Sequence, residues 1–244
     1  MKKLATNIAN RDKHPYQGFP AVEISKIGKR RTASPDGERH VSVTITPPNF
    51  QTAVFRVKGM VPLVVHRFSK KIADEMLAKQ IEGKSASSKK KREPQNIEDS
   101  FVQARYISPE GWDGFHAGSI RNAMISACRL VNFRMTLAKL SVFVEQDGWD
   151  KEEPTIPLIR IYGKAELLKS IARVETGQPY VTIRAKYMPW SANVKIRWDA
   201  DQFQLKDVTN LLARVGLQVG ICEGRPDSRN SPGQGWGLFE VERK

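Results

Sequence analysis

Glycine and arginine gather near the carboxyl end, in a segment with the residue types that bind phosphate. Residues 219–241 read VGICEGRPDSRNSPGQGWGLFEV. Glycine lets backbone N–H groups approach a phosphate closely, and an arginine adds a pair of charged hydrogen bonds. Gly224, Arg225 and Arg229 are therefore candidate phosphate ligands. A surface loop whose glycines only form turns explains the same spacing, so this pattern by itself favours neither interpretation.

A second candidate anion site lies where a helix is predicted to begin, at Ser119. Serine is a good N-cap, and apolar residues follow it at helical spacing: Ile120, Ala123, Met124, Ala127 and Val131. The amino-terminal end of a helix attracts anions, and Arg121 in the first turn would strengthen the attraction. The simpler alternative is a capped helix with a solvated arginine.

Cationic and apolar side chains alternate over 181–187 and again over 194–198, which predicts two strands. If these strands pair as a hairpin, one face presents four cations: Arg184, Lys186, Lys195 and Arg197. Trp190, near the expected turn, could stack on a base or lie in the core. A further cationic run occurs in the polar stretch 82–94, an expected mobile loop that could surround a nucleic-acid strand: Lys89, Lys90, Lys91 and Arg92.

The sequence contains no clear pattern for a metal site, a cofactor site or a catalytic site. The four histidines are scattered, and Cys128 and Cys222 are far apart, so no local zinc pattern exists. Asp199 and Asp201 fit a turn and N-cap better than a magnesium site. We therefore expect no metal, no cofactor and no catalytic residue.

The charge of the chain indicates a polyanionic partner. The 244 residues include 40 Lys and Arg against 26 Asp and Glu, a formal net charge of +14. Nucleic acid is the usual partner of so basic a protein. The apolar stretches, such as 61–65, are too short to cross a bilayer, and the first residues lead into no signal-peptide pattern. We expect a cytoplasmic protein with two free thiols and no membrane partner.

The elements that would position these residues predict an α+β fold. Strands are expected over 52–65, with a buried run over 60–65, and over 238–242. Helices are expected over 69–80, from 119 and over 205–215, the last capped by Gly216 with five residues inward: Leu205, Val208, Leu211, Leu212 and Val215. This order fits a ferredoxin-like, RRM-like βαββαβ core with a long insertion at about 69–110 and a β-hairpin extension. Residues 1–50 read as an arm or as loosely attached strands, and 51–244 as one domain.

Three segments occur in the order found in a known superfamily. They are the strand Phe55–Val65 with its internal Gly59, the helix start His116-Ala117-Gly118-Ser119-Ile120-Arg121-Asn122-Ala123, and the Gly224-Arg225 turn followed by Gly233-x-Gly235-x-Gly237. Over about 52–242 the chain resembles the RAMP superfamily, the RRM-like proteins that include backbone subunits of CRISPR effector complexes. Arg184-x-x-Tyr187-x-x-Trp190 and the turn over 220–226 are most similar to small phage-type relatives.

The resemblance implies a protein that binds a single strand without cleaving it. It also implies head-to-tail polymerisation along the strand, and for phage-type relatives single-stranded DNA in replication or recombination is favoured over RNA. The departures are the interruption of the glycine loop over 227–232 and the absence of the histidine or aspartate of the nuclease members. Two alternatives stay open: a guide-RNA-binding subunit of a CRISPR-like complex, and an endoribonuclease using His66 or His116.

Overall fold

The computed structural model describes residues 45–68, 70–81, 96–173, 179–228 and 233–242. The chain divides into two units, 1–46 and 47–244, and every described helix and strand belongs to the second. None of the helices in the described ranges has the length and apolar character that spanning a membrane requires.

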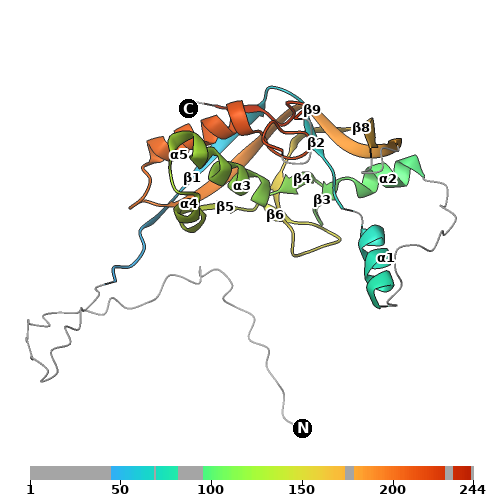
Figure 1. Ribbon diagram of the computed structural model, residues 1–244, viewed down its shortest axis with the longest axis horizontal. Coiled ribbons are helices and arrows are strands. Elements are labelled where there is room, and N and C mark those ends of the chain that lie inside the picture. Colours follow the sequence, from blue (N-terminus) through green and yellow to red (C-terminus); the bar gives the residue numbers. More distant parts are fainter. Residues whose placement is uncertain (1–44, 69, 82–95, 174–178, 229–232, 243–244) are drawn as a thin grey trace, which may run out of the picture. The chain divides into compact units, whose positions relative to one another are not determined.

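The second unit is built of helices and antiparallel sheets (Figure 1). The strands are β1 (Phe50–Gly59), β2 (Leu63–Val65), β3 (Tyr106–Ile107), β4 (Asp113–His116), β5 (Val142–Glu145), β6 (Gly148–Trp149), β7 (Pro157–Arg160), β8 (Tyr162–Arg173), β9 (Pro179–Asp199) and β10 (Phe239–Val241). The helices are α1 (Lys70–Ile81), α2 (Ile97–Gln103), α3 (Gly118–Ala127), α4 (Met135–Ser141) and α5 (Leu205–Arg214), with a 3-10 turn at Cys128–Val131 and a π-helical turn at Val215–Val219.

Strand β9 is the centre of the larger sheet. Its carboxyl-terminal half pairs with β1 on one edge and with β5 on the other, and β10 pairs with the far edge of β1. Here the neighbours follow the order β10-β1-β9-β5, all antiparallel, and we call these four strands the core sheet. The amino-terminal half of β9 pairs with β2 and with the long strand β8.

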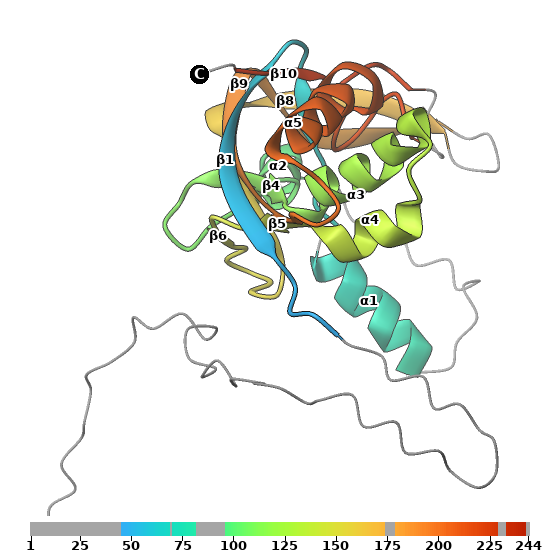
Figure 2. The same ribbon diagram turned by 90° about the vertical axis from the view of Figure 1, so that its left-hand side faces the viewer.

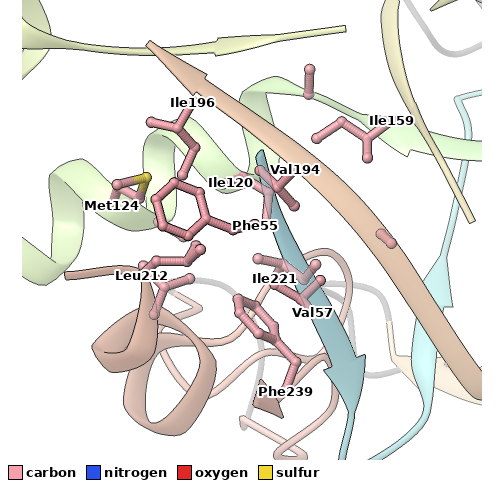
Figure 3. Packing of buried hydrophobic residues seen from close by; sticks show 14 of the residues in the cluster. Phe55, Val57, Ile120, Met124, Ile159, Val194, Ile196, Leu212, Ile221 and Phe239 are labelled. Atoms are coloured by element: carbon pink, nitrogen blue, oxygen red, sulfur yellow. The ribbon is translucent and has the colours of Figure 1, made fainter. Parts of the chain in front are cut away.

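The two faces of the core sheet differ because apolar and polar residues alternate along β1 and β9. Phe55 and Val57 of β1 and Val194 and Ile196 of β9 are buried on the face covered by α3 and α5 (Figures 2 and 3). Ile120 and Met124 of α3, Leu212 of α5, and Phe239 of β10 complete this core (Figure 3). The residues that alternate with them on β1 and β9 lie on the other side, where Val54 and Lys195 are exposed, and we call that side the open face.

A second sheet, in the order β3-β4-β7-β6, packs into the same core through Phe115 and Ile159. A buried ion pair also links it to the larger sheet: Arg67, just after β2, lies 2.9 Å from Asp150, just after β6, and the two side chains are 3% and 2% exposed. Their burial fixes the position of the β6–β7 connection beside the end of β2.

The predicted hairpin within 181–198 is wrong, because those residues form one continuous strand, β9. The alternation of burial changes phase between Tyr187 and Trp190, which are both buried while Met188 and Pro189 are exposed. The indole Nε1 of Trp190 donates to the Val61 carbonyl at 2.8 Å and ties this segment to the chain between β1 and β2. The hairpin extension is instead made by β8 and the amino-terminal half of β9.

The predicted strand over 52–65 is two strands. β1 ends at Gly59, where a Cβ atom would lie only 2.0 Å from Trp190 Nε1, so the indole requires a glycine there. Met60 is exposed and only Leu63–Val65 form the second strand, so the prediction of one buried run over 60–65 is wrong. The strand predicted over 238–242 is present as β10.

The predicted helices are present, with four differences near their ends. Ala117 stands at the N-cap of α3, without a side-chain hydrogen bond, and Ser119 lies inside the helix. Val131 is exposed because α3 ends at Ala127 and a 3-10 turn follows. In α5 the first residue, Leu205, is exposed, and Gly216 does not cap the helix but lies buried within the π-helical turn.

Candidate nucleic-acid interface

Two segments that the sequence marked separately meet at one pocket. We call it the α3 pocket; its volume is about 290 Å³. Its lining comes from the end of β4, from the length of α3, and from the segment 219–227, of which we call residues 220–227 the Gly–Arg turn. The lining residues are His116, Gly118, Ser119, Asn122, Ala123, Ser126, Val219, Cys222, Arg225 and Asp227. Ser119 and Arg225, far apart in the sequence, thus face the same space.

Glycines allow the Gly–Arg turn to fold back on the chain that follows it. Gly224 has φ +65°, and a Cβ atom there would lie 2.4 Å from the ring of Trp236. Gly237 has φ +72°, and its Cβ atom would lie 2.0 Å from the Ile221 carbonyl oxygen. Gly224 is buried against Trp236, so the prediction that its backbone presents itself to a phosphate is not met.

Hydrogen bonds hold Arg225 and Asp227 in place. Arg225 Nη1 donates to the Cys222 carbonyl at 2.9 Å, which fixes the guanidinium beside its own turn. Asp227 accepts from Ser126 Oγ at 2.5 Å and pairs with Arg129 at 2.7 Å, which ties the turn to α3. Burial acts to raise the pKa of Asp227, but the bonds from Ser126 and Arg129 outweigh it and hold that pKa below its usual value. Asp227 is therefore ionised at neutral pH, with Arg129 opposing its charge.

Two reactive residue types in the pocket are held neutral at pH 7. Burial raises the pKa of the Cys222 thiol to about 12, although Ser119 hydrogen-bonds to it, so the nucleophilic thiolate does not form. Burial also lowers the pKa of His116, whose Nδ1 accepts the Gly118 N–H at 2.8 Å. The lining is then polar, with Arg225 as its cation and Asp227 as its carboxylate.

Arg121 lies away from the α3 pocket, contrary to its predicted place beside Ser119. Residues two apart on a helix face different sides. The Arg121 guanidinium donates to the Val142 carbonyl at 3.0 Å and to the Lys139 carbonyl at 2.5 Å, and lies 5.4 Å from the centre of the Phe143 ring. It joins α3 to the junction of α4 and β5.

The four cations predicted on one hairpin face are spread along β9. Arg184 donates to Ser170 and Thr182 of the β8–β9 hairpin and pairs with Glu223 at 3.0 Å. Lys186 pairs with Glu166 of β8 at 2.8 Å. Both are therefore committed to acids on neighbouring elements rather than gathered with Lys195 and Arg197.

Lys195 and Arg197 lie on the open face of the core sheet. Lys195 pairs with Glu145 of β5 at 2.6 Å. The Arg197 guanidinium lies 5.1 Å from the ring centres of both Phe50 and Phe143, and 3.9 Å from Glu145. These residues form a cationic and aromatic surface, partly neutralised by Glu145.

Trp190 cannot serve as the predicted stacking platform, because it is only 2% exposed and packs edge-on against Phe239 in the core. Arg229 and the run Lys89, Lys90, Lys91 and Arg92 lie outside the described residues.

Sequence reasoning missed a second hollow, of about 730 Å³, at the start of β8. It is lined by Glu110, Gly111, Trp112, Asp113, Arg160, Ile161, Tyr162 and Gly163, and we call it the aromatic hollow. The available signal was the spacing of Arg160 and Tyr162 about Ile161, which places both on the solvent side of an extended segment. Within the described residues, no three His, Cys, Asp or Glu side chains gather as metal ligands would.

No protein-family model matches the chain, and no curated protein sequence matches it.

Proposed function

We propose that this protein binds single-stranded nucleic acid without cleaving it, and that a phosphate of the strand docks in the α3 pocket. The observation that carries the proposal is that Ser119 and Arg225 converge on this pocket. Arg225 supplies a guanidinium, which suits phosphate oxygens, and Ser119 a hydroxyl donor. The first turn of α3 holds no acidic side chain, and although its Gly118 N–H is bonded to His116 Nδ1, the positive end of the helix dipole still favours an anion.

The strand order supports a related proposal about the fold. Along the chain, the first to fourth strands of the core sheet are β1, β5, β9 and β10. Across the sheet they lie in the order fourth, first, third, second, with α3 and α5 on one face. This order is the one expected of the ferredoxin-like, RRM-like βαββαβ core that we propose. It agrees with the proposed RAMP relationship, and with it we propose head-to-tail assembly along single-stranded DNA, or RNA, in phage replication or recombination in the host cytoplasm.

Binding titrations test the proposal directly. Fluorescence anisotropy with labelled single-stranded DNA and RNA is measured over a range of salt concentrations for the wild type and for Arg225→Ala. Loss of one phosphate contact should weaken binding and make the slope of log K against log[salt] shallower by roughly 0.7. Arg214→Ala removes an exposed arginine of α5 that does not line the pocket, and serves as the charge-matched control. Equal affinities and slopes for the wild type and Arg225→Ala would contradict the proposal.

Purification without nuclease treatment separates the alternatives. A large, salt-sensitive particle containing DNA supports a filament on DNA, whereas bound RNA of one defined length favours a guide-RNA subunit. For the endoribonuclease alternative, His66→Ala or His116→Ala should abolish cleavage of RNA and keep binding. Absence of cleavage by the wild type removes that alternative.

A further inference from the structure

The aromatic hollow contains two aromatic rings held around one arginine. The Arg160 guanidinium lies 6.0 Å from the centre of the Trp112 ring and 5.2 Å from that of Tyr162. Tyr162 is 47% exposed, so much of its ring is accessible to a ligand. The hollow, of about 730 Å³, opens widely to solvent and leaves room for a planar group to lie against the rings.

The Trp112 ring is held before any ligand arrives, and Tyr162 is restrained more weakly, by a long hydrogen bond. The Trp112 ring packs over Gly114 and Gly148, where a Cβ atom would lie 3.1 Å and 2.8 Å from the indole. Trp112 Nε1 donates to Glu110 Oε2 at 2.5 Å, and the Tyr162 hydroxyl accepts from Asn193 Nδ2 at 3.5 Å. A ligand that stacks on a ring already ordered pays less entropy to bind.

The charges of the hollow select among ligands. The Arg160 guanidinium already lies near both rings, and its charge would repel a cationic ligand. Glu110 and Asp113 also line the hollow, and Asp113 is paired with Arg105 at 2.8 Å. Two carboxylates oppose a phosphate seated deep in the hollow. A neutral, planar group remains, one that stacks on aromatic rings or a guanidinium and donates hydrogen bonds to a carboxylate.

We infer that the aromatic hollow is a stacking site for a nucleobase of the bound strand. Nucleobases stack on tyrosine, tryptophan and arginine planes, and their amino or imino groups donate to carboxylates such as Glu110. This inference rests on the proposed function and adds to it a site for the base, separate from the α3 pocket proposed for the phosphate.

The test compares a strand with bases and one without them. Anisotropy is measured with a labelled deoxythymidine oligonucleotide and with an abasic oligonucleotide of the same length and backbone. Tyr162→Leu should weaken binding of the thymidine strand about fivefold or more and leave binding of the abasic strand unchanged. Tyr162→Phe keeps the ring and should retain wild-type affinity. Ile171→Ala, at an exposed apolar residue of the same strand β8, is the matched control and should change neither affinity.

The outcomes separate this site from the proposed function. If the wild type binds the thymidine strand and Tyr162→Leu binds it equally well, the stacking site is overturned while the proposed function stands. The same holds if Tyr162→Leu weakens both strands alike, because that loss does not involve bases. If the wild type binds neither strand, both proposals are overturned. The far-ultraviolet circular dichroism and melting temperature of each variant establish that it is folded.

Discussion

His116 shows how a single residue of the α3 pocket couples folding to pH. Its Nδ1 accepts the Gly118 N–H, and burial lowers its pKa below the ordinary value of 6.5. As the pH falls through about 6.5, the imidazole of the unfolded chain takes a proton first, whereas that of the folded chain resists. The contribution of His116 to the unfolding free energy is therefore fully present above about pH 6.5, and it is lost as the pH falls towards the folded-state pKa.

We predict that His116→Asn loses less stability than the wild type on acidification. Asparagine can accept the Gly118 N–H through its side-chain oxygen but does not titrate. Urea unfolding at about pH 7.5 and about pH 5.5 measures the change in unfolding free energy for each protein. His66, whose pKa burial also lowers, is present in both proteins and cancels in the comparison. Equal losses would show that His116 does not contribute to the acid sensitivity.

At Arg67 the prediction concerns stability alone. Its ion pair with Asp150 is almost completely buried, so Arg67→Met leaves a carboxylate in the interior with its cationic partner removed. Such a change typically destabilises a protein by about 3–5 kcal/mol. Glu152, which also pairs with Arg67 but is half exposed, provides the control: Glu152→Gln should change the unfolding free energy by less than about 1 kcal/mol. Chemical denaturation of the three proteins gives the comparison, and similar free energies for all of them would contradict the buried-pair argument.

For the elements, the alternation of residue types predicted which residues are buried better than it predicted how the strands are connected. The alternation over 183–187 and 194–198 separates the more buried from the more exposed residues on β9, because each half keeps one side against the core. At 181–182 it fails, since Val181 is exposed and Thr182 is buried. Nothing in that alternation distinguishes a turn from a change of phase within one strand. The phase changes at Trp190, which is held by a hydrogen bond to the Val61 carbonyl. Because Val61 is distant in the sequence, the alternation could not reveal this contact.

The candidate site was predicted in its parts but not in its assembly. Ser119 and Arg225 could be chosen from residue type and local motif, and both line the α3 pocket. Residue type and motif could not exclude Arg121 from the pocket, since its contacts with α4 and β5 depend on tertiary packing. The aromatic hollow was not predicted for the same reason. Trp112 precedes β4 and Tyr162 begins β8, and only the folded chain brings both rings near Arg160.

The next prediction concerns the π-helical turn that contains Gly216. The π-helical turn at Val215–Val219 brings this residue against β10, where a Cβ atom would lie 2.1 Å from the Phe239 carbonyl oxygen. Gly216→Ala must displace backbone and should lower the unfolding free energy by about 1–3 kcal/mol, as overpacking usually does. Gly235→Asn is the control, because no atom lies within 4 Å of its Cβ position and asparagine tolerates its φ of +74°. Thermal unfolding compares them; equal melting temperatures for the two variants would show that β10 moves aside easily.

For the whole molecule, the net charge of +14 overstates the cationic surface free for a nucleic acid. Among the described residues, Arg184, Lys186 and Lys195 each pair with an acid of the same domain. Only cations that contact phosphates and displace counterions contribute to the salt dependence of binding. For the proposed binding, a change in that slope on substitution of a cation therefore identifies whether the cation contacts a phosphate.

Glu145 allows the open face of the core sheet to be tested for such contact. Its carboxylate pairs with Lys195 at 2.6 Å and approaches Arg197 at 3.9 Å, so Glu145→Gln releases both cations while Phe50 and Phe143 still support the Arg197 guanidinium. If the strand crosses this face, affinity at low salt should rise and the salt slope should steepen by roughly 0.7 for each new phosphate contact. Asp74→Asn, in the exposed part of α1, changes the net charge equally and controls for long-range attraction. Titrations that cannot distinguish Glu145→Gln from Asp74→Asn would place the path of the strand away from the open face, since a released cation in contact with phosphate must act more strongly than a distant one.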